Sequence, residues 1–237
     1  AMLDVALTSF GRVDCLVNNA GNLPPTRIVC DMSLDELDRA LRVHVRGHFA
    51  TTIALTRHWR NEARRTGEPV AASIVNTASE AYLFGSPWRP DYAASKAAIV
   101  SLTVGTALSC APFGVRVNAI CPRASTRMTE GMLSGDAPAR DPRHTADLVV
   151  ALCGTPSVNG QVFVVGPGVV QVLAGPAVVR EFAPEDEDAE GGADRVASLL
   201  EGYFGTEGDV PAYGTPLGRT ARYLENLHES FEIRARD

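Results

Sequence analysis

Tyr92 and Lys96 lie four residues apart, and this spacing restricts the local structure strongly. If Tyr92 lies in the first turn of a helix, both side chains leave the same helix face, one turn from each other. Ser79 lies upstream, just after the β-branched run Ser73 to Thr77, and is expected to present its hydroxyl at the carboxyl end of a strand. Open α/β sheets bind ligands at that end of their strands. The stretch therefore predicts a strand, a loop and a helix that surround a binding site.

The residue types in this stretch suit proton transfer. A phenol with an ordinary pKa of about 10 is a poor acid–base catalyst at neutral pH, and a nearby ammonium favours the phenolate. We therefore expect Lys96 to lower the pKa of Tyr92. The pattern Y-x-x-x-K is weak on its own, because a helix with one exposed pair has the same spacing.

Two further motifs flank the stretch. V-N-N-A-G at 17–21 ends an apolar run upstream, and V-R-V-N-A-I-C-P at 115–122 forms a strand downstream. With Ser79 and Y-x-x-x-K in this order, the chain from Met2 to roughly Arg180 resembles the short-chain dehydrogenase/reductase superfamily. Three further passages resemble the 3-hydroxyacyl-CoA dehydrogenase part of peroxisomal multifunctional enzymes and their bacterial relatives: 43–49, 123–128 and 159–166.

The resemblance implies an α/β fold, a Rossmann-like doubly wound parallel sheet. The strand Val13 to Val17 corresponds to the fourth strand of that fold, so we expect a truncated sheet in which this strand is an exposed edge. The glycine-rich loop T-G-x-x-x-G-x-G, which cradles the cofactor pyrophosphate in the family, does not occur in the sequence. Gly166-Pro167-Gly168 opens no periodic helix, so we expect a turn there.

The composition changes beyond Glu181. Residues 185–192 are mostly acidic, which is typical of a solvated spacer. Apolar residues at helical spacing follow at 194–204 and 220–233. We expect residues 1–180 to form the C-terminal portion of the Rossmann-like fold, 181–193 an acidic linker, and 194–237 a C-terminal helical appendage for docking or dimerisation.

The resemblance also assigns roles to residues that match the family's motifs. Ser79, Tyr92 and Lys96 are the expected catalytic residues, and His44 takes the place of an Asn that holds a water in a proton relay. The expected cofactor-binding residues are Asn19, Ala20, Gly21, Lys96 and Thr126.

The segment after the strand Val115 to Ile120 departs from the family's pattern. Pro122 is followed by Arg123, where relatives usually carry Gly, and Thr126 lies one residue closer than usual. The segment Arg123 to Pro142 resembles the family's substrate lid, with an ordinary surface loop as the alternative.

The expected activity is that of an NAD(P)-dependent oxidoreductase acting on a carbonyl or secondary alcohol, such as a 3-hydroxyacyl thioester or an alicyclic alcohol. The missing glycine-rich loop supports an alternative, a relative without independent redox activity. Such a protein would serve as the non-catalytic partner of a full-length dehydrogenase, or as a cofactor-free acid–base enzyme in natural-product biosynthesis. For the same reason we expect NAD or NADP to bind weakly or not at all to this chain alone.

His44 and His48 are spaced four residues apart, as two metal ligands on one helix face would be. The glutamate of H-E-x-x-H and an evident third ligand are absent, so we expect no metal site. The cysteines show no C-x-x-C pattern and are expected to be reduced core thiols of a cytoplasmic protein: Cys15, Cys30, Cys110, Cys121 and Cys153.

Composition limits the partners. A net charge of -6 argues against nucleic acid, and the sequence shows neither a signal pattern nor an apolar run as long as a membrane span. We expect a small-molecule substrate and either a homo-oligomer or a hetero-oligomer with a full-length dehydrogenase. The exposed sheet edge and the small residues of the helix that begins at Tyr92 favour such contacts.

Periodicity and capping signals predict the remaining elements. A helix over Met2–Phe10 should stop at Gly11, and a long helix should run from Asp31 through Trp59, with Ser33 and Glu36 as a capping box and Leu34 facing the sheet. The other elements are expected at these positions: a polar loop at 61–69, helices at 92–111 and 145–153, the latter capped by Thr145, and a last core strand at 161–165.

Overall fold

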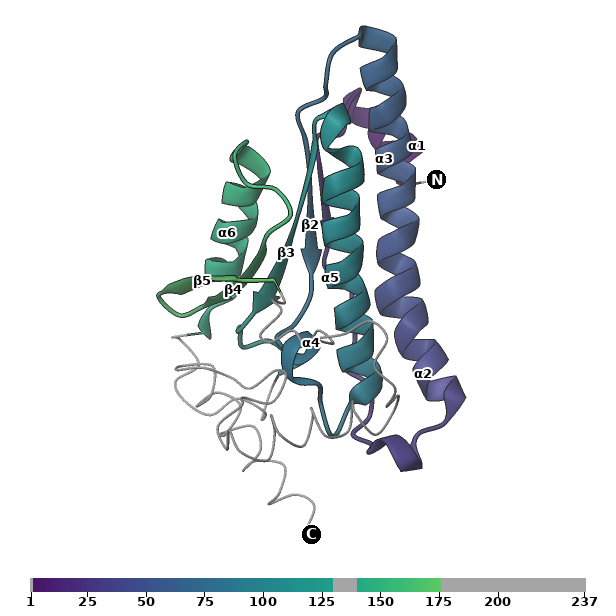
Figure 1. Ribbon diagram of the computed structural model, residues 1–237, viewed down its shortest axis with the longest axis vertical. Coiled ribbons are helices and arrows are strands. Elements are labelled where there is room, and N and C mark those ends of the chain that lie inside the picture. The colour runs from purple at the N-terminus through teal and green to yellow at the C-terminus, as the bar shows by residue number, and fades with distance from the viewer. Residues whose placement is uncertain (1, 130–139, 176–237) are drawn as a thin grey trace, which may run out of the picture. The chain divides into compact units, whose positions relative to one another are not determined.

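The computed structural model describes residues 2–129 and 140–175 of the 237-residue chain (Figure 1). Its centre is a five-stranded sheet in the order β1-β2-β3-β4-β5. The first four strands are parallel and the last is antiparallel to β4. The strands are β1 Cys15–Asn18, β2 Ala72–Thr77, β3 Val115–Pro122, β4 Val162–Gly166 and β5 Val169–Leu173. The predicted doubly wound α/β sheet is therefore confirmed.

Helices cover both faces of the sheet. Helices α3 and α5 lie side by side on one face, and α6 lies on the other (Figure 1). The α-helices are α1 Met2–Phe10, α2 Leu34–Leu41, α3 Gly47–Thr66, α4 Ala81–Phe84, α5 Pro90–Cys110 and α6 Arg143–Gly154. Three shorter segments complete the described elements: the 3-10 turns η1 Val29–Asp31 and η3 Ala111–Phe113, and the π-helical turn η2 Arg42–Arg46.

Strand β2 shows why the central strands lack polar alternation. Successive side chains of a strand point to opposite faces, and here both faces are covered. Ile74 packs in the cluster that contains Leu55 and Trp59 of α3, whereas Val75 packs against Leu152 of α6. The alternate residues of one short strand thus belong to two different cores.

A buried chain of side-chain hydrogen bonds joins the carboxyl ends of the strands to the helices. Asn18 Nδ2 donates to Asn76 Oδ1 at 2.9 Å, and Asn76 Nδ2 donates to Thr103 Oγ1 at 2.9 Å. Thr51 Oγ1 donates to Asn18 Oδ1 at 2.7 Å. Because the buried amides of Asn18 and Asn76 are satisfied by side chains of Thr51 and Thr103, the network fixes β1 and β2 relative to α3 and α5.

The second helical segment differs from the expected continuous helix. The Ser33–Glu36 capping box is confirmed, but Leu34 is 78% exposed and does not face the sheet. The π-helical turn interrupts the helix before α3 begins at Gly47. Helix α3 then continues to Thr66, so the loop predicted to begin at 61 begins later.

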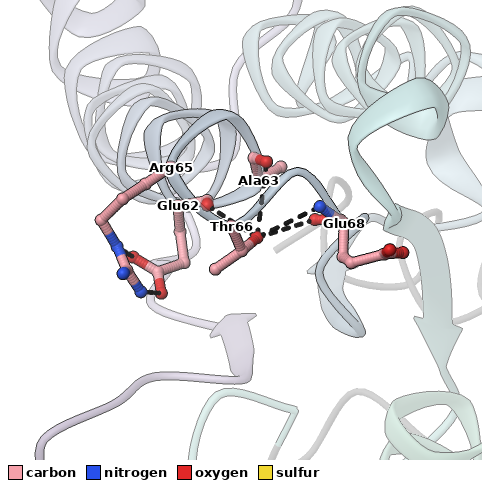
Figure 2. Close-up of polar contacts among 5 residues, drawn as sticks. All are labelled: Glu62, Ala63, Arg65, Thr66 and Glu68. Carbon is pink, nitrogen blue, oxygen red and sulfur yellow. Dashed lines mark hydrogen bonds and ion pairs between the residues drawn. The ribbon is translucent and has the colours of Figure 1, made fainter.

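Local polar contacts stabilise the last turns of α3, in the polar segment that was predicted to be a loop (Figure 2). Arg65 pairs with Glu62, and Thr66 Oγ1 donates to the Glu62 carbonyl at 3.0 Å. The helix ends where Gly67 adopts a left-handed conformation with φ 79°, which a glycine tolerates without steric cost.

Two other boundaries were wrong. The antiparallel strand β5 follows the predicted turn at Gly166–Gly168, so the strand at 161–165 is not the last. Thr145 lies within α6, whose N-cap is Pro142 and not Thr145. The predicted linker at 181–193, the helical tail at 194–237 and most of the expected lid lie outside the described residues.

Two expectations from composition also need correction. By length and composition alone, Pro90–Phe113 could cross a membrane. Here it packs on β3 and buries the polar residues Asp91, Ser95 and Lys96, as the core helix of a sheet protein does. All five cysteines lie in the described residues as free thiols, but only Cys121 is buried, while Cys15 and Cys30 are exposed.

Candidate active site

A cavity of about 790 Å³ lies at the carboxyl ends of β1, β2 and β3. It is lined by the segments that follow these strands, together with residues of α5 and the π-helical turn. All eight residues predicted for catalysis or cofactor binding line it: Asn19, Ala20, Gly21, His44, Ser79, Tyr92, Lys96 and Thr126. The structure therefore brings together every predicted site residue.

Tyr92 stands in the first turn of α5. Pro90 begins the helix, where its fixed φ and missing N–H are tolerated. The Tyr92 ring is half-buried, and burial raises the pKa of its phenol. A side-chain hydrogen bond with Ser79 and the charge of Arg89 act in the opposite direction on this pKa. Tyr92 is thus a neutral phenol at pH 7.

Lys96 lies one turn further along α5 and is buried. Its Nζ donates to the Thr77 carbonyl at 2.8 Å and lies 5.4 Å from the centroid of the Tyr92 ring. Burial lowers the pKa of Lys96 to about 8. The pKa of Tyr92 is raised on balance, because the cost of burying the phenolate outweighs the interaction with Ser79 and the charge of Arg89, and that Lys96 lowers this pKa stays a prediction.

Ser79 occupies the turn between β2 and α4. Its Oγ accepts the Ala81 N–H at 3.3 Å, and its backbone carbonyl accepts the Tyr82 N–H at 3.1 Å. These contacts hold the Ser79 turn, and Ser79 lines the cavity together with Tyr92. A carbonyl oxygen in the cavity could then be held by two hydroxyls at once.

His44 is 1% exposed, and its ring meets the Tyr92 ring edge-on at 5.4 Å between centroids. His44 Nε2 lies 2.9 Å from the Asn22 carbonyl, an acceptor, so Nε2 carries the proton and Nδ1 is an acceptor. Nδ1 is buried and has no hydrogen-bond partner among residues 2–129 and 140–175. Burial, followed by the charge of Lys96, lowers the pKa of His44, so the ring is neutral at pH 7.

The expected cofactor-side residues line the cavity next to this group. Asn19 Oδ1 accepts the Thr77 hydroxyl at 3.0 Å. Gly21 lies directly against His44, because a Cβ at Gly21 would come within 2.8 Å of His44 Cε1. On the far side, the Thr126 N–H donates to Thr129 Oγ1 at 2.9 Å, which shapes the turn there.

Several site residues were missed from the sequence. Thr77 contributes the carbonyl that holds Lys96. Arg89 joins the start of α5 to the loop after β1, donating from Nε to the Pro24 carbonyl at 3.0 Å and from Nη2 to Thr26 Oγ1 at 2.8 Å. Arg127 lines the cavity from the segment after β3. Arg127 lies in the passage 123–128 that carries part of the resemblance, whereas Thr77 and Arg89 are indicated only by their nearness to Ser79 and Tyr92 in the sequence.

The described residues contain no group of three side chains suited to a metal ion. His44 and His48 are both buried, and burial lowers the pKa of His48 to about 4. In the described part of the chain, His44 and His48 are therefore buried imidazoles packed in the core, with no third side chain placed to bind a metal ion with them.

Comparison with known proteins gives one consistent picture. The family model described as short chain dehydrogenase matches residues 1–135. Hydroxyacyl-CoA dehydrogenase ChsB1 of Mycobacterium tuberculosis is 37% identical over 186 residues, which cover 74% of this chain and 58% of that protein. Peroxisomal multifunctional enzyme type 2 of Mus musculus is 34% identical over 169 residues, covering 70% of this chain and 22% of that protein. The chain spans little more than half of the first relative.

Solved structures agree with the fold. The crystal structure of a short chain dehydrogenase from Mycobacterium avium has a TM-score of 0.76 and 35% identity, and the match covers 90% of this chain and 72% of that one. A 3-ketoacyl-(acyl-carrier-protein) reductase from Brucella melitensis, solved in complex with NADH, has a TM-score of 0.60 and 28% identity, covering 70% of this chain and 71% of that one.

Proposed function

Because the chain belongs to the short chain dehydrogenase family, we propose that it interconverts a carbonyl and a secondary alcohol with a nicotinamide cofactor, acting on a 3-hydroxyacyl thioester or an alicyclic alcohol. The observation that carries the proposal is the meeting of Ser79, Tyr92 and Lys96 at one cavity, at the carboxyl ends of parallel strands. The named relatives lend support through their acyl-CoA and acyl-carrier substrates.

Tyr92 is the proton donor in the reductive direction. Its neutral phenol gives a proton to the carbonyl oxygen while the carbonyl carbon gains a hydride, and the alcohol is formed. Ser79 donates a hydrogen bond to the same oxygen and so stabilises the developing negative charge. In the oxidative direction the alcohol proton returns to the Tyr92 oxygen. A bound nicotinamide supplies or accepts the hydride.

Lys96 stabilises the phenolate that Tyr92 becomes after it has given up its proton. One of its three N–H donors is used by the Thr77 carbonyl, which leaves two for the hydroxyls of the nicotinamide ribose. His44 Nδ1 is a hydrogen-bond acceptor beside the Tyr92 ring. It is suited to accept a hydrogen bond from a water that gives a proton back to the Tyr92 oxygen after Tyr92 has protonated the substrate. Asn19, Ala20, Gly21 and Thr126 complete the nicotinamide side of the cavity.

The mouth of the cavity suits a thioester with an anionic carrier. The exposed Arg127 and the 40%-exposed Met128 both line the cavity from the segment after β3. An apolar acyl or ring body next to Met128 and a carrier phosphate next to Arg127 would satisfy both side chains.

The experiment is a turnover assay of the purified 237-residue protein with NAD⁺ and NADP⁺. A short 3-hydroxyacyl-CoA and an alicyclic alcohol are the substrates, and reduced nicotinamide is followed by its absorbance. We expect one of the two substrates to be oxidised, and Tyr92→Phe to abolish the signal. No turnover of either substrate class with either cofactor would contradict the proposal.

One observation favours a second candidate, cofactor-free acid–base chemistry. Ser79, Tyr92 and Lys96 meet at the cavity through contacts within the described residues alone, so the proton-transfer group is in place without a bound nicotinamide. This candidate predicts exchange of the acidic carbon-bound proton of a 3-oxoacyl thioester for deuterium in D₂O without any nicotinamide. Such exchange should disappear in Tyr92→Phe. A chain that shows neither activity would be a non-catalytic partner of another dehydrogenase.

A further inference from the structure

Glu80 and Arg123 form a buried ion pair beside the cavity. Arg123 Nε donates to Glu80 Oε2 at 2.7 Å, and Nη2 donates to Oε1 at 2.5 Å. The two side chains are only 6% and 9% exposed. Each directly follows a cavity residue, because Glu80 follows Ser79 and Arg123 follows Pro122. The pair therefore joins the loop after β2 to the loop after β3.

The arginine side of the pair is anchored in the sheet. The Arg123 N–H donates to the Val165 carbonyl of β4 at 2.7 Å. The Arg123 side chain lies on Gly166, where an added Cβ would come within 3.2 Å of Arg123 Cβ. The guanidinium thus starts from a fixed backbone, and its two parallel bonds give the carboxylate one preferred orientation.

The glutamate side of the pair belongs to a short turn. Glu80 precedes α4, which has only four residues, and its carbonyl accepts the Leu83 N–H at 2.9 Å. Within the described residues, the Ser79 hydroxyl accepts the Ala81 N–H at a long 3.3 Å, and its interaction with the Tyr92 hydroxyl lowers the pKa of Tyr92. The position of the Ser79 hydroxyl therefore depends on how firmly this turn is held.

We infer that Glu80 and Arg123 are positioning residues, whose ion pair fixes the Ser79 turn against the ends of β3 and β4 and keeps the Ser79 hydroxyl beside Tyr92. This rests on the proposed function, in which Ser79 and Tyr92 share the substrate oxygen. It also accounts for Arg123 at a position where the resemblance led us to expect glycine, since a glycine there could not hold the Glu80 carboxylate.

Two effects of losing the Glu80 charge have opposite signs at Tyr92. If the turn loosens, the hydrogen bond from Ser79 weakens and the pKa of Tyr92 rises. If the turn stays in place, the loss of the negative charge of Glu80 can only favour the phenolate and lower that pKa. The other groups that face Tyr92 are unchanged by the substitution: Arg89, Lys96, Cys121 and His44. The direction of the shift thus separates positioning from a simple charge effect.

The test is the titration of Tyr92 in Glu80→Gln, followed by ¹⁹F NMR of protein labelled with 3-fluorotyrosine. The chain has five tyrosines, and the signal missing in Tyr92→Phe assigns the resonance. We expect Glu80→Gln to raise the pKa of Tyr92 by at least half of the rise seen in Ser79→Ala. In the Ser79→Ala background, Glu80→Gln should add no further rise.

A folded Glu80→Gln protein in which the pKa of Tyr92 stays constant or falls would overturn the inference, and so would an equal rise with and without Ser79. Glu80→Asp keeps the charge balance of the pair and is measured in the same way if Glu80→Gln does not fold. Glu62→Gln, which removes the exposed pair with Arg65, is the matched control and should leave the titration unchanged. The titration needs neither substrate nor cofactor. Its result can therefore be interpreted even if the turnover assay shows no activity, and the two failures can be distinguished.

Discussion

The Lys96 ammonium lies 5.4 Å from the centroid of the Tyr92 ring while it donates a hydrogen bond to the Thr77 carbonyl. The two groups are one helical turn apart, but the strand that ends at Thr77 fixes the lysine. Burial moves both pKa values, that of Lys96 down to about 8 and that of Tyr92 upward. Each group therefore favours its neutral form more than it would in water.

The first prediction concerns the pH dependence of stability. The folded pKa of Lys96 lies below its unfolded value of 10.5, so the unfolded chain binds more protons between pH 8 and about 10. In this window the free energy of unfolding should rise with pH, by on the order of 3 kcal/mol if the full shift is realised. Below pH 8 this contribution should be flat. Above pH 10 the raised pKa of Tyr92 acts in the opposite direction.

Urea unfolding of the wild type and of Lys96→Met, measured in steps from pH 7 to pH 10, isolates this contribution. The cysteines titrate in both proteins, so their contribution cancels in the difference between the two free energies of unfolding. That difference should change between pH 8 and pH 10, because only the wild type carries the Lys96 contribution. Parallel curves would show that Lys96 keeps an ordinary pKa.

The second prediction compares a buried ion pair with an exposed one. Arg123→Met leaves the Glu80 carboxylate buried and unpaired, which should cost about 3–5 kcal/mol of stability. Glu62→Gln breaks the solvent-exposed pair with Arg65 on α3 (Figure 2) and should leave the stability nearly unchanged. Thermal and urea unfolding of both variants measure the contrast, and equal losses would argue against a strongly held pair at the cavity.

The third prediction concerns the contact between Gly21 and His44. Gly21→Ala places a methyl group within 2.8 Å of His44 Cε1, so the ring must move and its bond to the Asn22 carbonyl must weaken. We expect a loss of about 1–3 kcal/mol of stability, as for other overpacked sites. Gly47→Ala is the control, because in the described part of the chain the added methyl meets nothing within 4 Å beyond its chain neighbours and the backbone of its own helix. It should stabilise the protein by about 0.5–1 kcal/mol.

The fourth prediction concerns oligomeric state. Strand β1 is at the edge of the described sheet, and its Val17 is 45% exposed. An uncovered edge with an apolar side chain favours pairing with another chain. We therefore expect light scattering on the purified protein to give a mass above the 25.2 kDa of one chain. A stable particle of 25.2 kDa would show that the chain covers its own edge.

The sequence predicted the site where local spacing determines it. Tyr92 and Lys96 share a helix face whatever the rest of the fold does, and Ser79 directly follows a strand, so their meeting required little tertiary information. The parallel sheet also followed from recognisable strands and motifs.

What the sequence did not predict depends on contacts between distant residues. Glu80 and Arg123 are 43 residues apart, and nothing in their neighbourhoods indicates that they pair. The direction of the Tyr92 pKa shift depends on burial, which residue types alone do not determine. Helix α3 continues to Thr66 because polar side chains bond to their own backbone, a pattern that is equally typical of a loop.

The role of Tyr92 is tested most directly by nicotinamide-dependent turnover of the wild type and of Tyr92→Phe under identical conditions. The substitution removes one hydroxyl and keeps the ring against His44, so the fold should survive with a loss of about 1 kcal/mol. Unfolding curves of the two proteins verify this. We expect the wild type to reduce NAD⁺ or NADP⁺ with a 3-hydroxyacyl thioester or an alicyclic alcohol, and the variant to be slower by at least about 10²-fold. Equal rates in the two folded proteins would contradict the role of Tyr92 as the proton-transfer group.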